Sequence, residues 1–495
     1  MKKQRLRIKA AVLLLFMLFA LLGFYGIWSV NHYGSRWFSY AGNPRLASLL
    51  GSVIKGDILD RNGTVLATTL DGQRKYHENA AVRSALVHVI GDRQRKIGNG
   101  VESFHAGYLY GVQPSLPEAL MRLTHPNEPR RGNNVTLTVD AEMCAAVPGW
   151  MNAHPLSRGK SGAVIVMNYL TGEILTMNSF PVFDPGEYPE DRTADDLSAL
   201  DHPYFNRATQ ALIPPGSTFK IITAAAAMER LPGVETRTFT CSGALPVSDS
   251  FTVRDFNHAV HGEVTLRKAF ANSCNPVFAT LALELGDSAL RSAAQRFGFN
   301  RNYVFRDVVV ENSVYPAESQ GPEALAASGY GQSALAVTPL HLCLISAAVA
   351  NDGRMPEPRL IHEVRTASGS PVLTFSSASA GTVCSPKTAA VLQSMMKDVV
   401  QSGGSGSRAS VSTLDIRGKT GTAESTSEGR PISYGWFTGY CAQKDLPFAV
   451  CVLVEDLPDG ETGGTAAAPI AREIFTYLKN HPVGPSAPIE SSTPF

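Results

Sequence analysis

The chain has 495 residues, of which 44% are hydrophobic and 18% are charged, and its formal net charge is +1. This length and composition are those of a globular protein with two or three domains, and they exclude a disordered chain. The near-neutral charge, with no long basic run beyond the N-terminus, argues against a nucleic-acid-binding surface.

The N-terminus predicts a membrane anchor. Five basic residues and no acid lie in residues 1–9, and no charged residue occurs from Ala10 to Val30. An uncharged run of this length spans a bilayer, whereas the apolar part of a cleaved signal peptide is roughly 7–15 residues long. Because basic flanks stay in the cytoplasm, we expect a cytoplasmic tail at 1–9 and a single-pass transmembrane anchor at 10–30, with the rest of the chain outside the membrane.

Residues 31–155 predict a small N-terminal pedestal or interaction domain. Asn62 and Gly63 lie between two apolar-rich runs, which is a strong hairpin signal. The stretch NNVTLTVDAEMCAAV, from residue 133, predicts a short strand followed by a helix. This region carries no catalytic constellation, so we expect it to act as a spacer or docking module.

Residues 156–482 predict an α+β domain. The stretch GAVIVMNYLTGEILTMNS, from residue 162, predicts a hairpin, and residues 434–440 and 447–456 predict further strands. Helical patterns lie between these strands, so the sheet is expected to be assembled from distant segments. The stretch 465–480 predicts an amphipathic helix, and the Pro- and Ser-rich residues 483–495 predict a disordered tail.

The seven cysteines do not indicate a metal site or a disulfide framework. They are scattered, without CxxC spacing and without histidine pairs at zinc-site spacing. We therefore expect no metal and no other cofactor, and we interpret each cysteine as a small buried hydrophobic residue: Cys144, Cys241, Cys274, Cys343, Cys384, Cys441 and Cys451.

The stretch IPPGSTFKIITAAAAMER, residues 213–230, contains a possible catalytic pair. Its apolar run predicts a buried helix, and a lysine rarely enters a core without a partner or a task. Lys220 follows Ser217 by three residues, which places the two side chains on one helix face. A buried lysine has a lowered pKa and can remove the serine proton. The free N–H groups at the helix start favour developing negative charge.

This S-x-x-K pattern is weak by itself, since it also occurs at Ser52, Ser157 and Ser394. Two further patterns follow Ser217 and make it specific. Ser273 and Asn275 lie in SCN, and Lys419, Thr420, Gly421 and Thr422 lie in KTGT on a predicted strand, the only Lys-Thr-Gly in the chain.

With these three patterns in this order, the chain resembles the penicillin-binding protein transpeptidases. The resemblance spans residues 160–480 and includes HGEVTLRKAFANSCNPVFA and GYGQSALAVTPLHL. The stretch GDILDRNG and the single anchor resemble the class B, monofunctional branch. The implied fold is the one these enzymes share with serine β-lactamases, an antiparallel sheet flanked by helices.

The resemblance implies a peptidoglycan D,D-transpeptidase. In that role, Ser217 attacks the D-Ala–D-Ala carbonyl of a stem peptide, and Lys220 takes the serine proton. Ser273 relays a proton to the leaving amine, and Asn275 binds the substrate amide and Lys220. Lys419 supplies positive charge.

The resemblance also implies how the substrate is held. Thr420 and Thr422 bind its carboxylate, and Gly421 lets its backbone lie close along the strand. The acyl-enzyme then passes to an amine of a neighbouring stem, whereas β-lactam antibiotics leave Ser217 acylated. The implied partner is a membrane-embedded SEDS-type glycan polymerase that contacts the anchor and pedestal.

Several alternatives remain open on the residues alone. A D,D-carboxypeptidase would transfer the acyl group to water, and a β-lactam-binding sensor or scaffold would not transpeptidate. A class A β-lactamase would need a Glu-x-x-Leu-Asn stretch between Asn275 and Lys419, and none occurs. The residues also do not distinguish a role in cell shape and elongation from one in cell division or sporulation.

Overall fold

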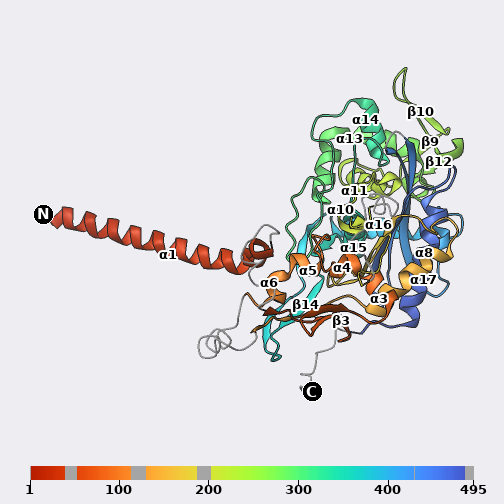
Figure 1. The fold of residues 1–495 in the computed structure, drawn as a ribbon. Coiled ribbons are helices and arrows are strands. Elements are labelled where there is room, and N and C mark those ends of the chain that lie inside the picture. Colours follow the sequence, from red (N-terminus) through yellow and green to blue (C-terminus); the bar gives the residue numbers. More distant parts are fainter. Residues whose placement is uncertain (1, 40–52, 113–129, 187–201, 428–429, 485–495) are drawn as a thin grey trace.

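The structure is a computed structural model that describes residues 2–39, 53–112, 130–186, 202–427 and 430–484. One long helix, α1 (Lys2–Ser39), projects from a body of packed helices and sheets (Figure 1). Its segment Arg7–Gly26 has a mean hydropathy of 2.3 and is long and apolar enough to cross a membrane. The side chains of this segment are exposed. Most of the predicted disordered tail lies outside the described residues.

The body is built on a five-stranded antiparallel sheet with the strand order β17-β18-β19-β7-β8. The predicted hairpin from residue 162 is confirmed, and its first strand, β7, pairs with β19 from the far end of the chain. The strands are β7 (Gly162–Asn168), β8 (Ile174–Phe180), β17 (Ile416–Ser427), β18 (Arg430–Cys441) and β19 (Phe448–Val454).

Both faces of this sheet are buried. Along β19, Val450 and Val452 pack into the core on one face, while Cys451 and Leu453 pack into the core on the other. The first face is covered by the predicted C-terminal helix, α17 (Gly463–Asn480), and by α8 (Ala141–Ala153); the second is covered by α15 (Pro339–Ala350). The predicted α+β class, with helices on an antiparallel sheet, is therefore confirmed.

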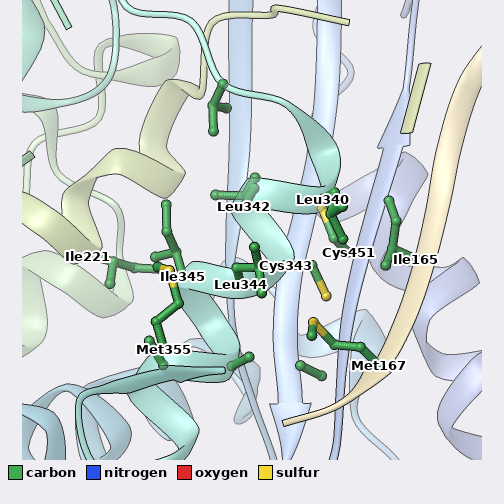
Figure 2. Packing of buried hydrophobic residues seen from close by; sticks show 14 of the residues in the cluster. Ile165, Met167, Ile221, Leu340, Leu342, Cys343, Leu344, Ile345, Met355 and Cys451 are labelled. Carbon is green, nitrogen blue, oxygen red and sulfur yellow. The ribbon is translucent and has the colours of Figure 1, made fainter. Parts of the chain in front are cut away.

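Helix α15 is buried on every side, from Pro339 to Val349. A helix that is apolar all round belongs in the middle of a core. In Figure 2, α15 lies between the strands that carry Ile165 and Cys451 and the helix that carries Ile221. That helix is α11 (Lys220–Arg230), which begins at the predicted catalytic lysine, so the core fixes its position.

The remaining helices and short strands of the body surround these layers, and β9, β10 and β12 lie near α13 and α14 at one end of the molecule (Figure 1). The helices are α10 (Arg207–Gln210), η1 (Gly216–Phe219), η2 (Phe256–His258), α12 (Leu266–Ala271), α13 (Asn275–Arg296), α14 (Pro322–Gly329), α16 (Pro386–Val400) and η3 (Ser407–Ala409). Three two-stranded antiparallel sheets pair β9 (Thr238–Cys241) with β12 (Gly262–Thr265), β10 (Ala244–Pro246) with β11 (Thr252–Arg254), and β13 (Arg354–Pro356) with β16 (Ser379–Thr382).

A second, six-stranded sheet has the order β15-β14-β6-β2-β3-β4. The predicted hairpin at Asn62 and Gly63 is confirmed, because β2 and β3 pair in antiparallel fashion and Gly63 has a φ of 85°. The predicted strand and helix after residue 133 are β6 and α8. The strands are β2 (Ile58–Leu59), β3 (Val65–Leu70), β4 (Gln73–Tyr76), β6 (Asn134–Leu137), β14 (Ile361–Arg365) and β15 (Pro371–Thr374).

Two strands of this second sheet come from the C-terminal half of the chain, since β14 pairs with β6. The N-terminal region is thus tied to the rest of the body through a shared sheet. Its other elements are β1 (Val53–Ile54), paired in parallel with β5 (Arg130–Arg131), and the short helices α3 (Ala80–Ala85), α4 (Val87–Ile90), α5 (Val101–Phe104) and α6 (Ala106–Leu109).

Candidate active site

Ser217 lies on η1, the turn that leads into α11. Gly216 has a φ of +53°, and a Cβ at this position would lie 2.4 Å from the carbonyl oxygen of Thr422. Its N–H donates to the Gly331 carbonyl at 3.0 Å. Only glycine combines this backbone conformation with such a close approach. The glycine before the serine therefore lets the turn lie against the KTGT strand.

Lys220 is fully buried, and its Nζ atom has oxygen partners from two motifs. It lies 3.1 Å from Ser217 Oγ, 3.1 Å from Ser273 Oγ and 2.7 Å from Asn275 Oδ1, and it also donates to the Ser273 carbonyl. The predicted Ser–Lys pair is thus within hydrogen-bond distance. The SCN turn, which follows Lys220 by more than fifty positions in the sequence, thus contacts the same lysine.

Ser273 links Lys220 to the third motif. It lies between α12 and α13 and has a φ of +61°, a left-handed conformation that is uncommon for a residue other than glycine. Lys419, on β17, lies 3.0 Å from Ser273 Oγ through its Nζ atom, which also donates to the Thr420 carbonyl at 2.9 Å. The five predicted catalytic side chains therefore form one hydrogen-bonded group.

Burial lowers the pKa of both lysines. The pKa of Lys220 falls to about 7, chiefly because burial penalises the ammonium form, while Asp255 and Cys274 oppose the change. The pKa of Lys419 is also lowered well below its usual value, first by burial and then by repulsion from Lys220. A large share of Lys220 is therefore neutral at physiological pH, as a base that accepts the Ser217 proton must be.

Asn275, the first residue of α13, is held on both sides. Its Oδ1 accepts from Lys220, and its Nδ2 donates to the Arg254 carbonyl at 3.1 Å. Its backbone N–H donates to Asp255 Oδ1 at 3.3 Å. The side-chain amide is therefore fixed at the edge of the cleft.

The KTGT strand, β17, is at the edge of the main sheet. Thr420 Oγ1 lies 2.8 Å from Ser405 Oγ, and Thr422 Oγ1 accepts from the Gly463 N–H at 3.2 Å. A Cβ on Gly421 would lie 2.8 Å from the Pro215 carbonyl oxygen, so this glycine lets the strand meet the serine turn. An edge strand at the site can accept an extended peptide as an added strand.

These residues lie at a cleft with a volume of about 620 Å³. The size suits an extended peptide end or a small drug-sized molecule. Six of the eight predicted site residues line the cleft, while Lys220 and Lys419 are fully buried behind it. The lining residues are Ser217, Arg254, Asp255, Phe256, Asn257, Ala259, His261, Asn272, Ser273, Asn275, Tyr330, Gln332, Ser405, Thr420, Gly421, Thr422, Glu424, Ser433, Asp459, Gly460, Glu461 and Thr462.

Several of these residues were not predicted from the sequence. Ser405 contacts Thr420 from the glycine- and serine-rich stretch SGGSGS, whose composition indicates a loop but not its place at the site. Tyr330 and Gln332 come from GYGQ, a stretch of the resemblance to which no role was assigned. The amino-acid composition of these loops does not indicate which residues they contact.

All seven cysteines are buried, as predicted. Two of them lie together with an acid and a histidine, which their spacing in the sequence did not indicate. Among the described residues, this group could hold a metal ion: Cys241, Asp255, His261 and Cys274.

Comparison with known proteins identifies the family of the chain. Residues 162–476 match the family model of the penicillin binding protein transpeptidase domain, the stretch that contains all three motifs. The chain belongs to this family. In this penicillin-binding protein, the S-x-x-K, S-x-N and Lys-Thr-Gly motifs lie around one cleft.

Named relatives agree with this assignment. This penicillin-binding protein is 33% identical over 361 residues to the peptidoglycan D,D-transpeptidase PbpA of Mycolicibacterium smegmatis, a match that covers 69% of this chain and 72% of the relative. It is 30% identical over 418 residues to the stage V sporulation protein D of Bacillus subtilis, covering 79% of this chain and 62% of that protein.

A solved structure shows the same fold. The ceftriaxone acyl-enzyme complex of penicillin-binding protein A from M. tuberculosis superposes with a TM-score of 0.76 at 28% identity, covering 87% of this chain and 99% of that chain. The fold class predicted from the sequence is thus confirmed.

Proposed function

We propose that this penicillin-binding protein is a peptidoglycan D,D-transpeptidase that crosslinks stem peptides through an acyl-enzyme on Ser217. The observation that carries the proposal is the distance of 3.1 Å between Ser217 Oγ and the Nζ atom of the fully buried Lys220. A hydroxyl becomes an effective nucleophile when a neutral base at hydrogen-bond distance takes its proton.

Acylation begins with attack of Ser217 Oγ on the carbonyl carbon between the two D-alanines. The hydroxyl proton passes to neutral Lys220, and the carbonyl oxygen takes the negative charge. The N–H groups of Ser217 and Thr422 would stabilise that oxygen. The C–N bond then breaks, the leaving amine takes a proton from Lys220 by way of Ser273 Oγ, and D-alanine departs.

The substrate would lie along the free edge of β17. Its carboxylate would be bound by Thr420 and Thr422, next to Lys419, to which we assign the single positive charge of the lysine pair, and its amide would meet Asn275. Gly421 has no side chain, so a peptide backbone can lie close along the strand at this point.

The second half of the reaction uses the same groups. An amine of a neighbouring stem attacks the Ser217 ester, Lys220 accepts the amine proton, and Ser217 leaves with a proton restored to its oxygen. A β-lactam undergoes only the first half of the reaction. Its ring amide bond breaks as the ester with Ser217 forms, and the leaving amine stays attached to the acyl group. Ser217 then remains acylated.

The proposed location rests on the apolar segment of α1. We propose that this helix anchors the protein in the bacterial cell membrane as a single-pass segment, with the basic residues 1–9 in the cytoplasm and the catalytic domain outside. Its apolar segment supports the anchor. A SEDS-type glycan polymerase in the same membrane, contacting the anchor and pedestal, would supply the glycan strands.

We propose the same division of the chain that the sequence suggests. The tail is 1–9, the anchor 10–30 and the pedestal 31–155, followed by the transpeptidase domain at 156–482 and a tail at 483–495. Support for the boundary at 155 comes from β7, which begins at Gly162, where the family match also begins.

The proposal is tested with purified full-length protein and glycan strands that carry pentapeptide stems. We expect released D-alanine and crosslinked stem dimers by mass spectrometry, and neither product from Ser217→Ala. Released D-alanine without dimers would identify a D,D-carboxypeptidase. A folded wild-type protein that releases no D-alanine and forms no acyl-enzyme with penicillin would contradict the enzyme assignment.

A further inference from the structure

Glu424 lies on the same face of β17 as the two threonines of the KTGT motif. Successive side chains of a strand point to opposite faces, so residues two apart share a face. Thr420, Thr422 and Glu424 have this spacing, and all three line the cleft together with Ser217. Ala423, between the last two, is fully buried. Glu424 is thus the next residue of the strand, after the two threonines, that faces the cleft.

The carboxylate of Glu424 is exposed and makes no ion pair in the part of the chain that the structure describes. Arg430, on the neighbouring strand β18, pairs with Asp456 instead, at 3.1 Å. Tyr330, another residue of the cleft wall, lies near Glu424, because burial raises the pKa of Tyr330 and the charge of Glu424 raises it further. A free carboxylate beside an aromatic ring is a suitable place for an ammonium group of a ligand.

The charge of the cleft wall also favours a cation. Asp459 and Glu461 line the cleft with Glu424, whereas Arg254 alone is a lysine or arginine among the described lining residues. A cleft wall with an excess of carboxylates attracts a positively charged group of a substrate.

The donor stem carries such a group, and here the inference rests on the proposed function. A crosslink joins the acyl group of one stem to an amine of its neighbour. Because the two stems are copies of one peptide, the donor also carries this amine, on a residue before its two D-alanines. A side-chain amine is an ammonium ion at neutral pH. The donor thus brings a positive charge into the cleft.

The proposed binding of the donor along β17 determines where this charge lies. The terminal carboxylate reaches Thr420, while the reacting carbonyl, one residue earlier in the peptide, lies at the Thr422 N–H. The peptide therefore continues past Thr422 towards Glu424, antiparallel to β17. An extended chain advances about 3.3 Å per residue, so the residue before the two D-alanines lies within reach of the Glu424 side chain.

We propose that Glu424 binds the side-chain ammonium of the donor residue that precedes the two D-alanines, and that it thereby determines which stems act as donors. A stem with a free amine carries the charge that Glu424 binds. A stem whose amine is already crosslinked carries a neutral amide at this position and loses the contact. The enzyme would therefore select donors that have not yet acted as acceptors.

Two pentapeptide donors that differ in one group test this selection. One donor has a free side-chain amine and the other has this amine acetylated, and excess glycine serves as the acyl acceptor for both. The initial rate of D-alanine release at low donor concentration gives kcat/KM for each donor. We expect full-length wild-type protein to prefer the free amine by about three- to tenfold, between the effect of an exposed ion pair and that of a charged hydrogen bond.

Substitutions assign the preference to one residue. Glu424→Gln should lose the preference because the carboxylate charge is removed, and Glu424→Asp should keep part of it. Asp459→Asn removes an equal charge from another position of the cleft and should keep the preference. Glu473→Gln, which changes an exposed glutamate of α17, should keep it as well. An equal loss of preference in Asp459→Asn would assign the selection to cleft charge in general and would overturn the proposal.

A second measurement uses the wild type alone and covers the case in which the variants fail to fold. Raising sodium chloride from about 0.1 M to about 1 M should reduce the preference, because salt screens an exposed ion pair. Equal rates with the two donors at low salt, or a preference that persists in folded Glu424→Gln, would overturn the proposal and leave the transpeptidase assignment intact. No release of D-alanine from either donor would overturn both.

Discussion

The side-chain nitrogens of Lys220 and Lys419 share one oxygen: they lie 3.1 Å and 3.0 Å from Ser273 Oγ. Both lysines are fully buried, and two adjacent ammonium groups without a carboxylate between them would repel each other strongly in such a place. Burial and this repulsion favour at most one positive charge on the pair, and a base for Ser217 requires that the neutral amine be that of Lys220.

Removing the amine of Lys220 tests this arrangement. Lys220→Ala should lower the rate of acylation by a fluorescent penicillin by on the order of 10²–10⁴-fold, because the base is lost. Lys220→Arg should fail as well, since a guanidinium stays protonated. The controls are Lys160→Ala and Lys397→Ala, the lysines of two other S-x-x-K matches, whose amines pair with Asp456 and Asp415. Rapid labelling of a folded Lys220→Ala protein would remove this lysine from the role of base.

The backbone of Ser273 predicts a difference between two substitutions. Ser273→Ala and Ser273→Gly both remove the hydroxyl between the lysines, so both should slow acylation to a similar degree. Glycine adopts a φ of +61° without strain, whereas alanine does not. Ser273→Gly should therefore be more stable than Ser273→Ala by on the order of 1 kcal/mol in thermal unfolding. Equal stability of the two variants would show that this conformation is not strained.

The contact between β17 and the serine turn makes Gly421 sensitive to one added carbon. In Gly421→Ala the new Cβ would lie 2.8 Å from the Pro215 oxygen and 2.9 Å from Thr218 Cγ2, so the strand or the turn must move. We expect slower penicillin acylation in a protein that still folds. Gly149→Ala is the control, because this exposed glycine of α8 has open space around it and alanine favours a helix. Unchanged acylation of Gly421→Ala would show that the contact is not needed.

A buried histidine predicts how stability depends on pH. His341 lies in the core between Ser313 and the Phe297 carbonyl, and burial lowers its pKa from 6.5 to about 4. Between these values the unfolded chain binds a proton that the folded chain does not. Stability is therefore fully present above pH 6.5 and is lost as pH falls towards 4.

The measurement is the thermal midpoint at pH 7.5 and pH 5.0. The wild type should lose about 2 kcal/mol at pH 5.0 through this one group, and His341→Gln should lose correspondingly less. His258→Gln, which changes an exposed histidine, should follow the wild type. An identical fall in His341→Gln and the wild type would contradict the prediction.

Local patterns predicted much of the fold. The hairpins at Gly63 and after Gly162 follow from turn residues between alternating apolar runs, and the strand that carries Lys419 follows from its composition. The three short motifs in their order carried the family resemblance, and the resemblance predicted which side chains meet around Ser217.

Contacts between distant segments could not be predicted in the same way. The pairing of β14 with β6 joins strands more than two hundred residues apart, and nothing in either strand specifies that partner. Cys241 and Cys274 meet only after β9, the β11–β12 loop and α13 have folded together. Asp255 and His261 lie in a loop, where no sequence period indicates which way a side chain points. Their grouping could therefore be seen only in the three-dimensional arrangement.

The central claim is that the oxygen of Ser217 carries the acyl group. The most direct measurement is mass spectrometry of the purified full-length protein after incubation with penicillin, followed by peptide mapping of the adduct. We predict one adduct per chain, located on the peptide that contains Ser217, and none on a folded Ser217→Ala protein. An adduct on another residue, or one that persists in Ser217→Ala, would contradict this account.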